Sequence, residues 1–460
     1  MYQIDFNKPQ SVHFIGIGGI SMSGLAEILF DEGFRVSGSD MHRSELTDRL
    51  EAKGIHVDYG QRAENIRDDI EVVVYTAAVH PDNPEFQAAK EKGIPMMPRA
   101  DLLGEMMRNY KHAVNISGTH GKTTTTSMLT EILLAAEADP TVTVGGILPA
   151  IGGNIRVGGP EFFVAEACEY TNSFLSFFPT LEIILNIEAD HLDFFKDLED
   201  IRHSFRLFAQ KLDENGVLII NRDIERMEEI TEGLPCKVIT FGKDPEKSIY
   251  SAADIVFDQL ARASYTLLIE GRPEGTITLG VPGMHNVYNS LSAIAASREL
   301  GISMEKIRTG LLHFTGTNRR FEKKGEIGGV TVIDDYAHHP QEIRATLTTA
   351  KNYPHKKLWC VFQPHTYTRT AALLDDFVQA LMEADEVILA DIYAAREVNT
   401  IGISSADVAE RIQAAGGKAH YIPSFDDIET FILENCVPGD LLITMGAGDI
   451  VKVGEKLLGL

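Results

Sequence analysis

The chain has 460 residues, of which 44% are hydrophobic and 24% charged, and its formal net charge at pH 7 is −25. That length exceeds what one hydrophobic core supports and predicts roughly three domains, while the acidic balance disfavours a nucleic-acid or anionic-membrane partner. Four scattered cysteines, the lack of a signal-peptide pattern and the lack of an apolar run of membrane-spanning length predict a cytoplasmic protein with reduced thiols and no membrane insertion.

The first predicted unit opens with a buried strand, a glycine-rich turn and a helix, over residues 11–31. A second strand at 34–38 runs on to Asp40, and this arrangement resembles the dinucleotide-binding fingerprint with its ribose-binding acid. Ser21 stands where the third glycine of that fingerprint is expected. We predict a Rossmann-like domain over residues 1–108. A nicotinamide cofactor, the diphosphate of another nucleotide and a purely architectural turn remain open as explanations of the glycine-rich segment.

A phosphate-binding loop is predicted at the start of the second unit. An apolar run over residues 112–116 leads into the segment Gly118–Thr124, and a helical pattern follows. The glycines allow consecutive N–H groups to face one anion, Lys122 adds a full positive charge, and the Thr123 hydroxyl is placed for a phosphate-bound magnesium. Ile116 replaces the first glycine of the common motif, so a turn that binds nothing is the alternative. We predict a nucleoside triphosphate site.

Two later strands of this unit end in polar residues of the kind that bind metal. A strand at 162–165 runs into Glu166, and a strand at 181–185 runs into a segment that contains His191 and Asp193. Because ligands collect beyond the carboxyl ends of parallel strands, Glu166 and His191 are expected near the phosphates and could bind Mg²⁺. Oxygen suits this ion better than imidazole does, and a surface acid or a capping group is the alternative at each position.

The second unit is predicted to end at a basic, glycine-containing segment, which gives it the bounds 109–321. Before that segment a helix begins near residue 284. Its first turn carries His285, Asn286 and Asn289, whose side chains can read the edge of a base, although Asn286 could instead act only as a helix cap.

Strands and helices alternate again over residues 322–460, and polar or glycine-rich residues follow the strands. We therefore predict an α/β protein with three domains: a Rossmann-like N-terminal domain, a central domain of the P-loop ATPase type and a C-terminal Rossmann-like domain. The adjacent His338 and His339 could suggest a zinc site. No third ligand has a clear spacing, and Pro340 fits the first position of a helix, so zinc is not favoured here.

A family resemblance spans nearly the entire chain. The segments GIGGISMSG, DNPE, GTHGKTT, EACEY, NIEADHLD, GMHNVYNSLSA, RRFE, DDYAHHP, FQPHTYTRT and GAGDI occur in the order found in the Mur ligases. The resemblance implies an ATP- and Mg²⁺-dependent enzyme of peptidoglycan synthesis that joins L-alanine to the lactyl carboxylate of UDP-N-acetylmuramate through an acyl phosphate. It also implies a monomer or weak homodimer. A sibling ligase that adds a ready-made peptide and a non-catalytic nucleotide-binding regulator are the alternatives.

The resemblance further implies a set of site residues. The sugar nucleotide would bind in the first domain, at Gly16, Gly18, Gly19 and Ser21. ATP would contact Gly118, Thr119, His120, Gly121, Lys122, Thr123, Thr124, His285, Asn286, Asn289 and Asp335. Magnesium would be held by Thr123, Glu166 and His191, and the catalytic group would be Lys122, Glu166, His191 and Arg320. The amino acid would meet His338, His365 and Arg369 in the third domain.

Three departures from the family pattern stand out. Cys168 occupies a position where the family often has Asp, and Thr366 occupies one where it has Arg. Several related ligases carry a carbamylated lysine after the Asp-His pair, but the corresponding stretch here reads HSFRLF. We therefore do not expect that modification.

Overall fold

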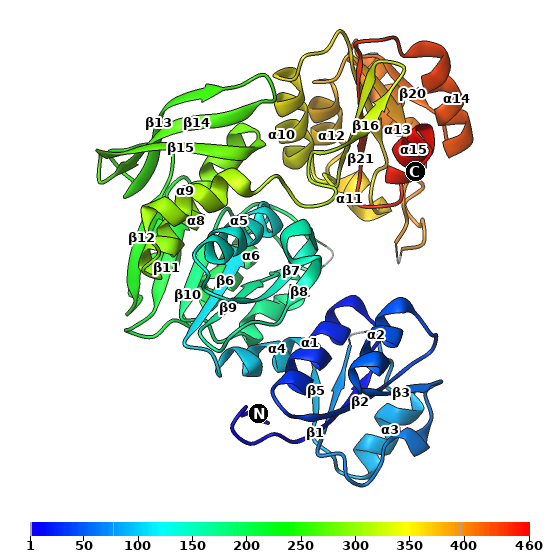
Figure 1. Ribbon diagram of the computed structural model, residues 1–460. Helices are drawn as coiled ribbons and strands as arrows, with labels where there is room; N and C mark the ends of the chain where they lie inside the picture. The colour runs from blue at the N-terminus through cyan, green and yellow to red at the C-terminus, as the bar shows by residue number, and fades with distance from the viewer. Residues whose placement is uncertain (1, 77, 193, 396) are drawn as a thin grey trace.

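The computed structural model describes residues 2–76, 78–192, 194–395 and 397–460, which form three consecutive α/β units (Figure 1). The predicted Asp193 lies outside the described residues. The first unit is blue in Figure 1, the middle unit runs from cyan to light green, and the third runs from yellow to red. The predicted fold class, α/β with three domains, is confirmed. No helix in the described part of the chain is both long enough and apolar enough to cross a lipid bilayer.

The first unit is built on a parallel sheet with the strand order β3-β2-β1-β4-β5. Its central strands are buried because helices cover both faces, as parallel sheets require. The elements are β1 (Ser11–Ile15), α1 (Ile20–Asp31), β2 (Arg35–Asp40), α2 (Glu45–Lys53), β3 (His56–Tyr59), η1 (Ala63–Asn65), β4 (Val72–Tyr75), α3 (Pro84–Glu91), β5 (Met96–Pro98) and α4 (Arg99–Met107). The chain order reverses at β1, so a ligand crevice is expected beyond the carboxyl end of that strand.

The middle unit has the strand order β15-β14-β13-β12-β11-β10-β6-β9-β7-β8. Its elements are β6 (His112–Ser117), α5 (Lys122–Ala135), β7 (Thr141–Leu148), η2 (Pro149–Ile151), β8 (Gly153–Arg156), β9 (Phe162–Glu166), η3 (Tyr170–Ser176), β10 (Leu181–Ile184), α6 (Leu198–Ala209), β11 (Val217–Asn221), α7 (Met227–Thr231), β12 (Lys237–Phe241), β13 (Tyr250–Phe257), β14 (Arg262–Ile269), β15 (Arg272–Pro282), α8 (Met284–Glu299) and α9 (Met304–His313). Strand β6 pairs in parallel with β10 and with β9. The residues that follow these three strands therefore meet at one edge of the sheet.

The third unit has the strand order β16-β17-β21-β18-β19-β20, with β16 antiparallel at the edge. Its elements are β16 (Glu322–Ile327), β17 (Val330–Asp335), α10 (Pro340–Lys351), β18 (Leu358–Phe362), α11 (Tyr367–Ala372), α12 (Leu374–Leu381), β19 (Glu386–Leu389), α13 (Ser405–Ala414), β20 (Ala419–Tyr421), α14 (Phe425–Asn435), β21 (Leu441–Met445) and α15 (Val451–Leu458). The carboxyl ends of β17 and β18 face the middle unit through the loops that follow them, as the ion pairs described below show.

The first unit packs closely against the middle unit. A Cβ atom at Gly24 in α1 would lie 1.9 Å from the Cδ1 atom of Ile155 in β8, so only glycine fits there. The Ser176 hydroxyl of η3 donates a 2.6 Å hydrogen bond to Asp101 of α4. These contacts position the glycine-rich turn of the first unit near the middle sheet.

Candidate active site

The loop between β6 and α5 needs glycine at both ends. Gly118 has a φ of +138° and Gly121 a φ of +87°, which other residues rarely adopt. A Cβ atom at residue 118 would also lie 2.9 Å from the Cβ atom of Leu185. The segment after β10 holds the loop in place, because the Asn186 side chain accepts from the backbone N–H of His120 at 2.8 Å and donates to its carbonyl at 3.0 Å.

Lys122 begins helix α5, and its ammonium group turns back over the loop. It donates to the carbonyl oxygens of Gly118 and Thr119 and to the carboxylate of Glu169, the last at 3.0 Å. Burial alone would lower the pKa of Lys122, but the charge of Glu169 outweighs this and holds that pKa above its usual value. Glu169 is itself buried. The loop therefore carries a fixed cation with a buried counter-charge.

Two of the three predicted magnesium ligands are in contact. The Thr123 hydroxyl donates to Oε2 of Glu166 at 3.2 Å, and Oε1 of Glu166 accepts from the backbone N–H of Gly145 at 2.5 Å. Burial raises the pKa of Glu166 above its usual value. A hydroxyl and a carboxylate next to a phosphate loop are the oxygen donors that suit Mg²⁺.

His191, the third predicted ligand, has its described contacts elsewhere. Its ring lies 4.6 Å from the ring of Tyr170, measured between centroids, and its Nε2 atom is 3.8 Å from Oδ2 of Asp190. The backbone of His191 has a φ of +53°. This side chain lines the second cavity described below.

A cavity of about 230 Å³ lies between the phosphate loop, the start of α8 and the third unit. It gathers most of the residues predicted to contact ATP, although they are widely separated in sequence. From the loop come His120, Gly121 and Thr124; from α8, His285, Asn286 and Asn289; from the junction and third unit, Arg320, Asp335 and Glu342. The sequence prediction that these segments share one site is consistent with this arrangement.

The amide and carboxylate groups of this cavity are held by local hydrogen bonds. Asn289 donates to Oδ1 of Asn286 at 3.0 Å, and Asn286 donates to the carbonyl of Pro282 at 2.7 Å. Asp335 accepts from the backbone N–H groups of Phe321 and Ala337 at 2.9 and 2.8 Å. Burial raises the pKa of Asp335 to about 6. These side chains are therefore orientated before any ligand arrives.

A second cavity, of about 460 Å³, lies between the segment after β10 and helix α11. His365 and Arg369 line it from the third unit, and Asp190 and His191 line it from the middle unit. Arg369 pairs with Asp190 at 2.9 Å. Burial alone would raise the pKa of Asp190, but the Arg369 charge outweighs this and holds that pKa well below its usual value. An ion pair thus joins the two units at this cavity.

The ring of His338 packs against the ring of His365, with 5.6 Å between their centroids. The Nδ1 atom of His338 is 3.1 Å from the carbonyl oxygen of Tyr336. Burial lowers the pKa of His338 to about 4, so the ring is neutral. Thr366 has a φ of +65° and immediately precedes α11. The structure brings His338, His365 and Arg369 together at one edge of the third unit.

The glycine-rich turn of the first unit connects β1 to α1. Gly16 has a φ of +83°, and the N–H of Gly18 donates to Oδ2 of Asp40 at 2.9 Å. Gly19 precedes the first residue of α1, and the Ser21 hydroxyl accepts from the guanidinium of Arg99 at 3.0 Å. A helix N-terminus with an adjacent guanidinium is suited to a phosphate-bearing ligand.

Sequence reasoning missed Glu169, Arg99 and Glu342. Glu342 accepts from the backbone N–H groups of His338 and His339 and is 3.1 Å from Nδ1 of His120. Its position three residues after His339 fits a capping box, which is a sequence signal for a helix start. The contact between Glu342 and His120 has no signal in the sequence, because the two residues belong to different units.

Three family models match the chain. The model of the Mur ligase family catalytic domain matches residues 11–111, that of the Mur ligase middle domain matches 116–297, and that of the Mur ligase glutamate ligase domain matches 319–448. The chain is 65% identical to a UDP-N-acetylmuramate–L-alanine ligase of Lachnospira eligens and 60% identical to one of Agathobacter rectalis. Each alignment spans 458 residues and 100% of both chains.

Two solved structures of Mur-type ligases align with nearly the whole chain. A UDP-N-acetylmuramate–alanine ligase from Thermotoga maritima aligns with a TM-score of 0.79 and 30% identity, covering 98% of each chain. A murein peptide ligase from Psychrobacter arcticus aligns with a TM-score of 0.67 and 25% identity, also covering 98% of each chain.

Proposed function

Because the chain belongs to the Mur ligase family, we propose that it joins L-alanine to the lactyl carboxylate of UDP-N-acetylmuramate, with conversion of ATP to ADP and phosphate. The two relatives with 65% and 60% identity carry that activity in their names. The observation that carries the proposal is the common edge at which the phosphate loop, the cavity beside α8 and the Arg369 cavity meet.

We propose that ATP binds with its phosphates on the segment Gly118–Thr124 and its base near His285, Asn286 and Asn289. The shared cavity supports this assignment, as does the left-handed backbone of the loop glycines, which turns N–H groups toward one point. Asp335 would contact the ribose. Lys122 and Arg320 would balance the charge of the transferring phosphoryl group, which is the main task of a protein in this chemistry.

Mg²⁺ would be held by Thr123, Glu166 and His191. The Thr123–Glu166 contact supports the first two, whose oxygens suit this ion. When bound, the ion supplies Lewis-acid stabilisation of charge on the phosphate oxygens.

The sugar nucleotide would bind at the turn formed by Gly16, Gly18, Gly19 and Ser21. Arg99 extends that set, because its guanidinium already contacts Ser21 at the helix N-terminus. The Asp40 carboxylate accepts from the N–H of Gly18 and so holds the turn. The names of the relatives with 65% and 60% identity favour the sugar nucleotide over a nicotinamide cofactor.

L-Alanine would bind in the second cavity, at His365 and Arg369, with His338 behind them. A guanidinium is suited to the carboxylate of an amino acid, and Arg369 is already held by Asp190. Thr366 stands where the family has Arg, so Arg369 is the cation we assign to this role.

The reaction follows from the need to activate a carboxylate. The lactyl carboxylate oxygen attacks the γ-phosphorus of ATP, ADP leaves, and an acyl phosphate forms. The neutral amine of L-alanine then attacks the acyl carbon, phosphate leaves, and the amine loses a proton to give the amide. The middle unit would bind ATP, the first unit the sugar nucleotide and the third unit L-alanine. Closure of the three units around the site would keep water from the acyl phosphate. We propose that the three domains span residues 1–108, 109–321 and 322–460.

ADP formation measured with UDP-N-acetylmuramate and a panel of amino acids tests the proposal. We expect release that depends on both substrates and is fastest with L-alanine. Faster release with an L-alanine-containing tripeptide would instead show a peptide-adding ligase, and ATP binding without substrate-dependent release would show a regulator. Positional isotope exchange within ATP that requires the sugar nucleotide would support the acyl phosphate.

A further inference from the structure

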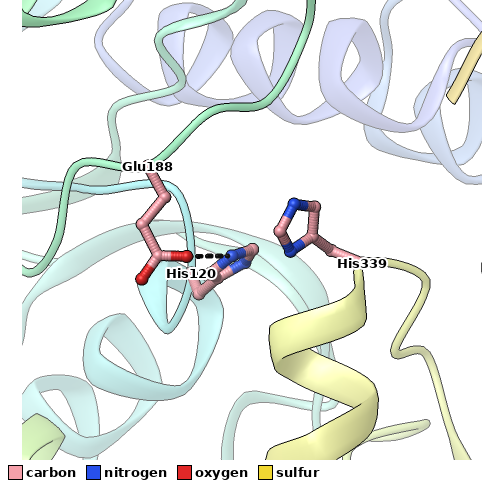
Figure 2. A group of neighbouring side chains, drawn as sticks. All are labelled: His120, Glu188 and His339. Carbon is pink, nitrogen blue, oxygen red and sulfur yellow. Dashed lines mark ion pairs between the residues drawn. The ribbon is translucent and has the colours of Figure 1, made fainter. Parts of the chain in front are cut away.

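Three side chains outside the proposed magnesium set converge between the middle and third units. His120 comes from the phosphate loop, Glu188 from the segment after β10, and His339 from the residue that caps α10; Figure 2 shows them pointing toward one another. One ligand atom from each lies within 4.8 Å of the other two. The rings of His120 and His339 are 4.7 Å apart between centroids.

Polar atoms in this group are left without hydrogen bonds. Within the described residues, Nε2 of His120, Oε2 of Glu188 and Nε2 of His339 are buried and have no hydrogen-bond partner. The first two atoms are 3.3 Å apart, which is near enough for an ion pair but not aligned as a hydrogen bond. His339 is only 5% exposed. Buried polar atoms without partners are costly, and an ion that binds them removes that cost.

The spacing of His120 and Glu188 fits a tetrahedral ion, and a ligand atom of His339 lies within 4.8 Å of both. Two nitrogen or oxygen ligands that each lie about 2.0–2.2 Å from a tetrahedral zinc are about 3.3–3.6 Å from one another. The His120–Glu188 distance of 3.3 Å already has that value. Two imidazoles and one carboxylate select a zinc-class cation over magnesium, and three protein ligands leave the fourth position to a water.

Glu342 completes the arrangement from the other side of His120. Its carboxylate is 3.1 Å from Nδ1 of His120, so it can accept the proton of that nitrogen and leave Nε2 for a metal. Metal-binding histidines usually have such a carboxylate behind them.

We propose that His120, Glu188 and His339 form a site for a zinc-class divalent cation that ties the phosphate loop to the start of α10. In the sequence, only the adjacent His338 and His339 suggest zinc, and no third ligand has a clear spacing. The fold supplies two more ligands from distant segments and uses His339 but not His338.

The site would also oppose nucleotide binding, a consequence that rests on the proposed function. His120 and Glu188 line the cavity assigned to ATP. An ion held between them and His339 would fix His120 away from a phosphate and keep the middle and third units together. Occupation by the cation and by the nucleotide should therefore be antagonistic.

Titration of the metal-free, full-length chain with Co²⁺ tests the site without any nucleotide or substrate. We expect one equivalent to bind with the intense visible absorption of a tetrahedral N/O site and Zn²⁺ to displace it. Glu188→Gln and His339→Asn should each weaken binding by at least the about 10- to 100-fold that loss of an outer-sphere partner costs. Asn is a strong helix cap, so His339→Asn removes the imidazole while preserving the start of α10.

His112→Gln serves as the matched control, because His112 is a partly buried histidine at the opposite end of β6, stacked on Phe162. It should bind Co²⁺ like the unaltered chain. Melting temperatures measured without metal confirm that each variant is folded. The proposal would be overturned if Glu188→Gln and His339→Asn bound Co²⁺ as tightly as the unaltered chain does. A weak octahedral spectrum, or a thiolate charge-transfer band that identifies a cysteine ligand, would also overturn it.

The antagonism has a separate readout. Saturating ATP should lower the apparent Co²⁺ affinity of the unaltered chain, and unchanged affinity would refute that consequence. Because the Co²⁺ spectrum needs no turnover, failure of the ligase proposal would leave this site intact, and failure of the site would leave substrate-dependent ADP release intact.

Discussion

The molecule contains two strand–glycine loop–helix turns, and they differ in what surrounds them. In the first unit, the turn at residues 16–21 is held by neighbours of its own unit, through Asp40 and Arg99. In the middle unit, the loop at residues 118–124 is held by a buried carboxylate, Glu169, and is touched from the third unit by Glu342. The same local pattern therefore gives a self-contained binding turn in one unit and, in the other, a loop whose charges depend on two units.

The largest expected difference between the turns concerns Lys122, for which the first turn has no counterpart. Lys122→Met should lower kcat by about 10²–10³, because it removes the fixed charge that we assign to the transferring phosphoryl group. Calorimetric binding of UDP-N-acetylmuramate, which we assign to the first turn, should be unchanged. Steady-state ADP release measures the effect.

The buried pair makes a structural control necessary. Lys122→Met alone leaves Glu169 unpaired and should cost about 3–5 kcal/mol of stability. The double variant Lys122→Met/Glu169→Gln should regain much of that stability without regaining turnover. Lys111 precedes β6 and forms an exposed ion pair with Glu161. Lys111→Met should therefore change neither the stability nor the turnover. Near-normal turnover of Lys122→Met would remove the basis for the phosphate assignment.

A second difference is electrostatic and should appear as a pH dependence. The pKa of His120 is raised from 6.5 to about 9 in the folded chain. Its contribution to stability is therefore fully present below pH 6.5 and is lost as the pH rises through about 9. In urea unfolding with a chelator present, the stability advantage of the unaltered chain over His120→Gln should fall by about 3 kcal/mol at most across that range. Ser21→Ala, in the first turn, should show a pH-independent difference.

The two turns should also differ in how they tolerate alanine. Gly16→Ala and Gly118→Ala both place a side chain at positive φ, which costs about 1–2 kcal/mol. Only Gly118 adds a clash, since its Cβ atom would lie 2.9 Å from Leu185, whereas the nearest atom to a Cβ at Gly16 is 3.9 Å away on Thr76. Gly118→Ala should therefore lose about 1–3 kcal/mol more in urea unfolding. Equal losses of stability in Gly16→Ala and Gly118→Ala would show that backbone strain alone sets the cost and that the contact with Leu185 adds nothing.

The smallest effect lies within the first turn. A Cβ atom at Gly18 would lie 2.8 Å from Oδ2 of Asp40, whereas the nearest atom to one at Gly19 is 3.5 Å away and φ there is −64°. Gly18→Ala should raise the KM for UDP-N-acetylmuramate about tenfold, a change of about 1.4 kcal/mol, and leave the KM for ATP unchanged. Gly19→Ala should leave both constants nearly unchanged. An effect of Gly18→Ala on the KM for ATP instead would contradict the division of labour between the two turns.

The sequence by itself determined the alternation of strands and helices, the two glycine turns and the order of the motifs. These follow from local rules: apolar runs form buried strands, glycine permits positive φ, and a helix begins where a cap and its partner allow it. The predicted loop at Gly118–Thr124 and the residues at the ends of β9 and β10 are therefore found at one sheet edge, as parallel pairing requires.

Only the tertiary structure decided which side chains neutralise and orientate the predicted ones. Glu169 reaches Lys122 across 47 positions in the sequence, and Glu342 reaches His120 across 222. The same holds for His191, which the sequence grouped with Thr123 and Glu166 but whose described contacts are with Tyr170 and Asp190. Such pairings depend on how segments far apart in the sequence pack against one another, within a unit for Glu169 and His191 and between two units for Glu342. No periodicity, cap or turn rule along the chain encodes that packing.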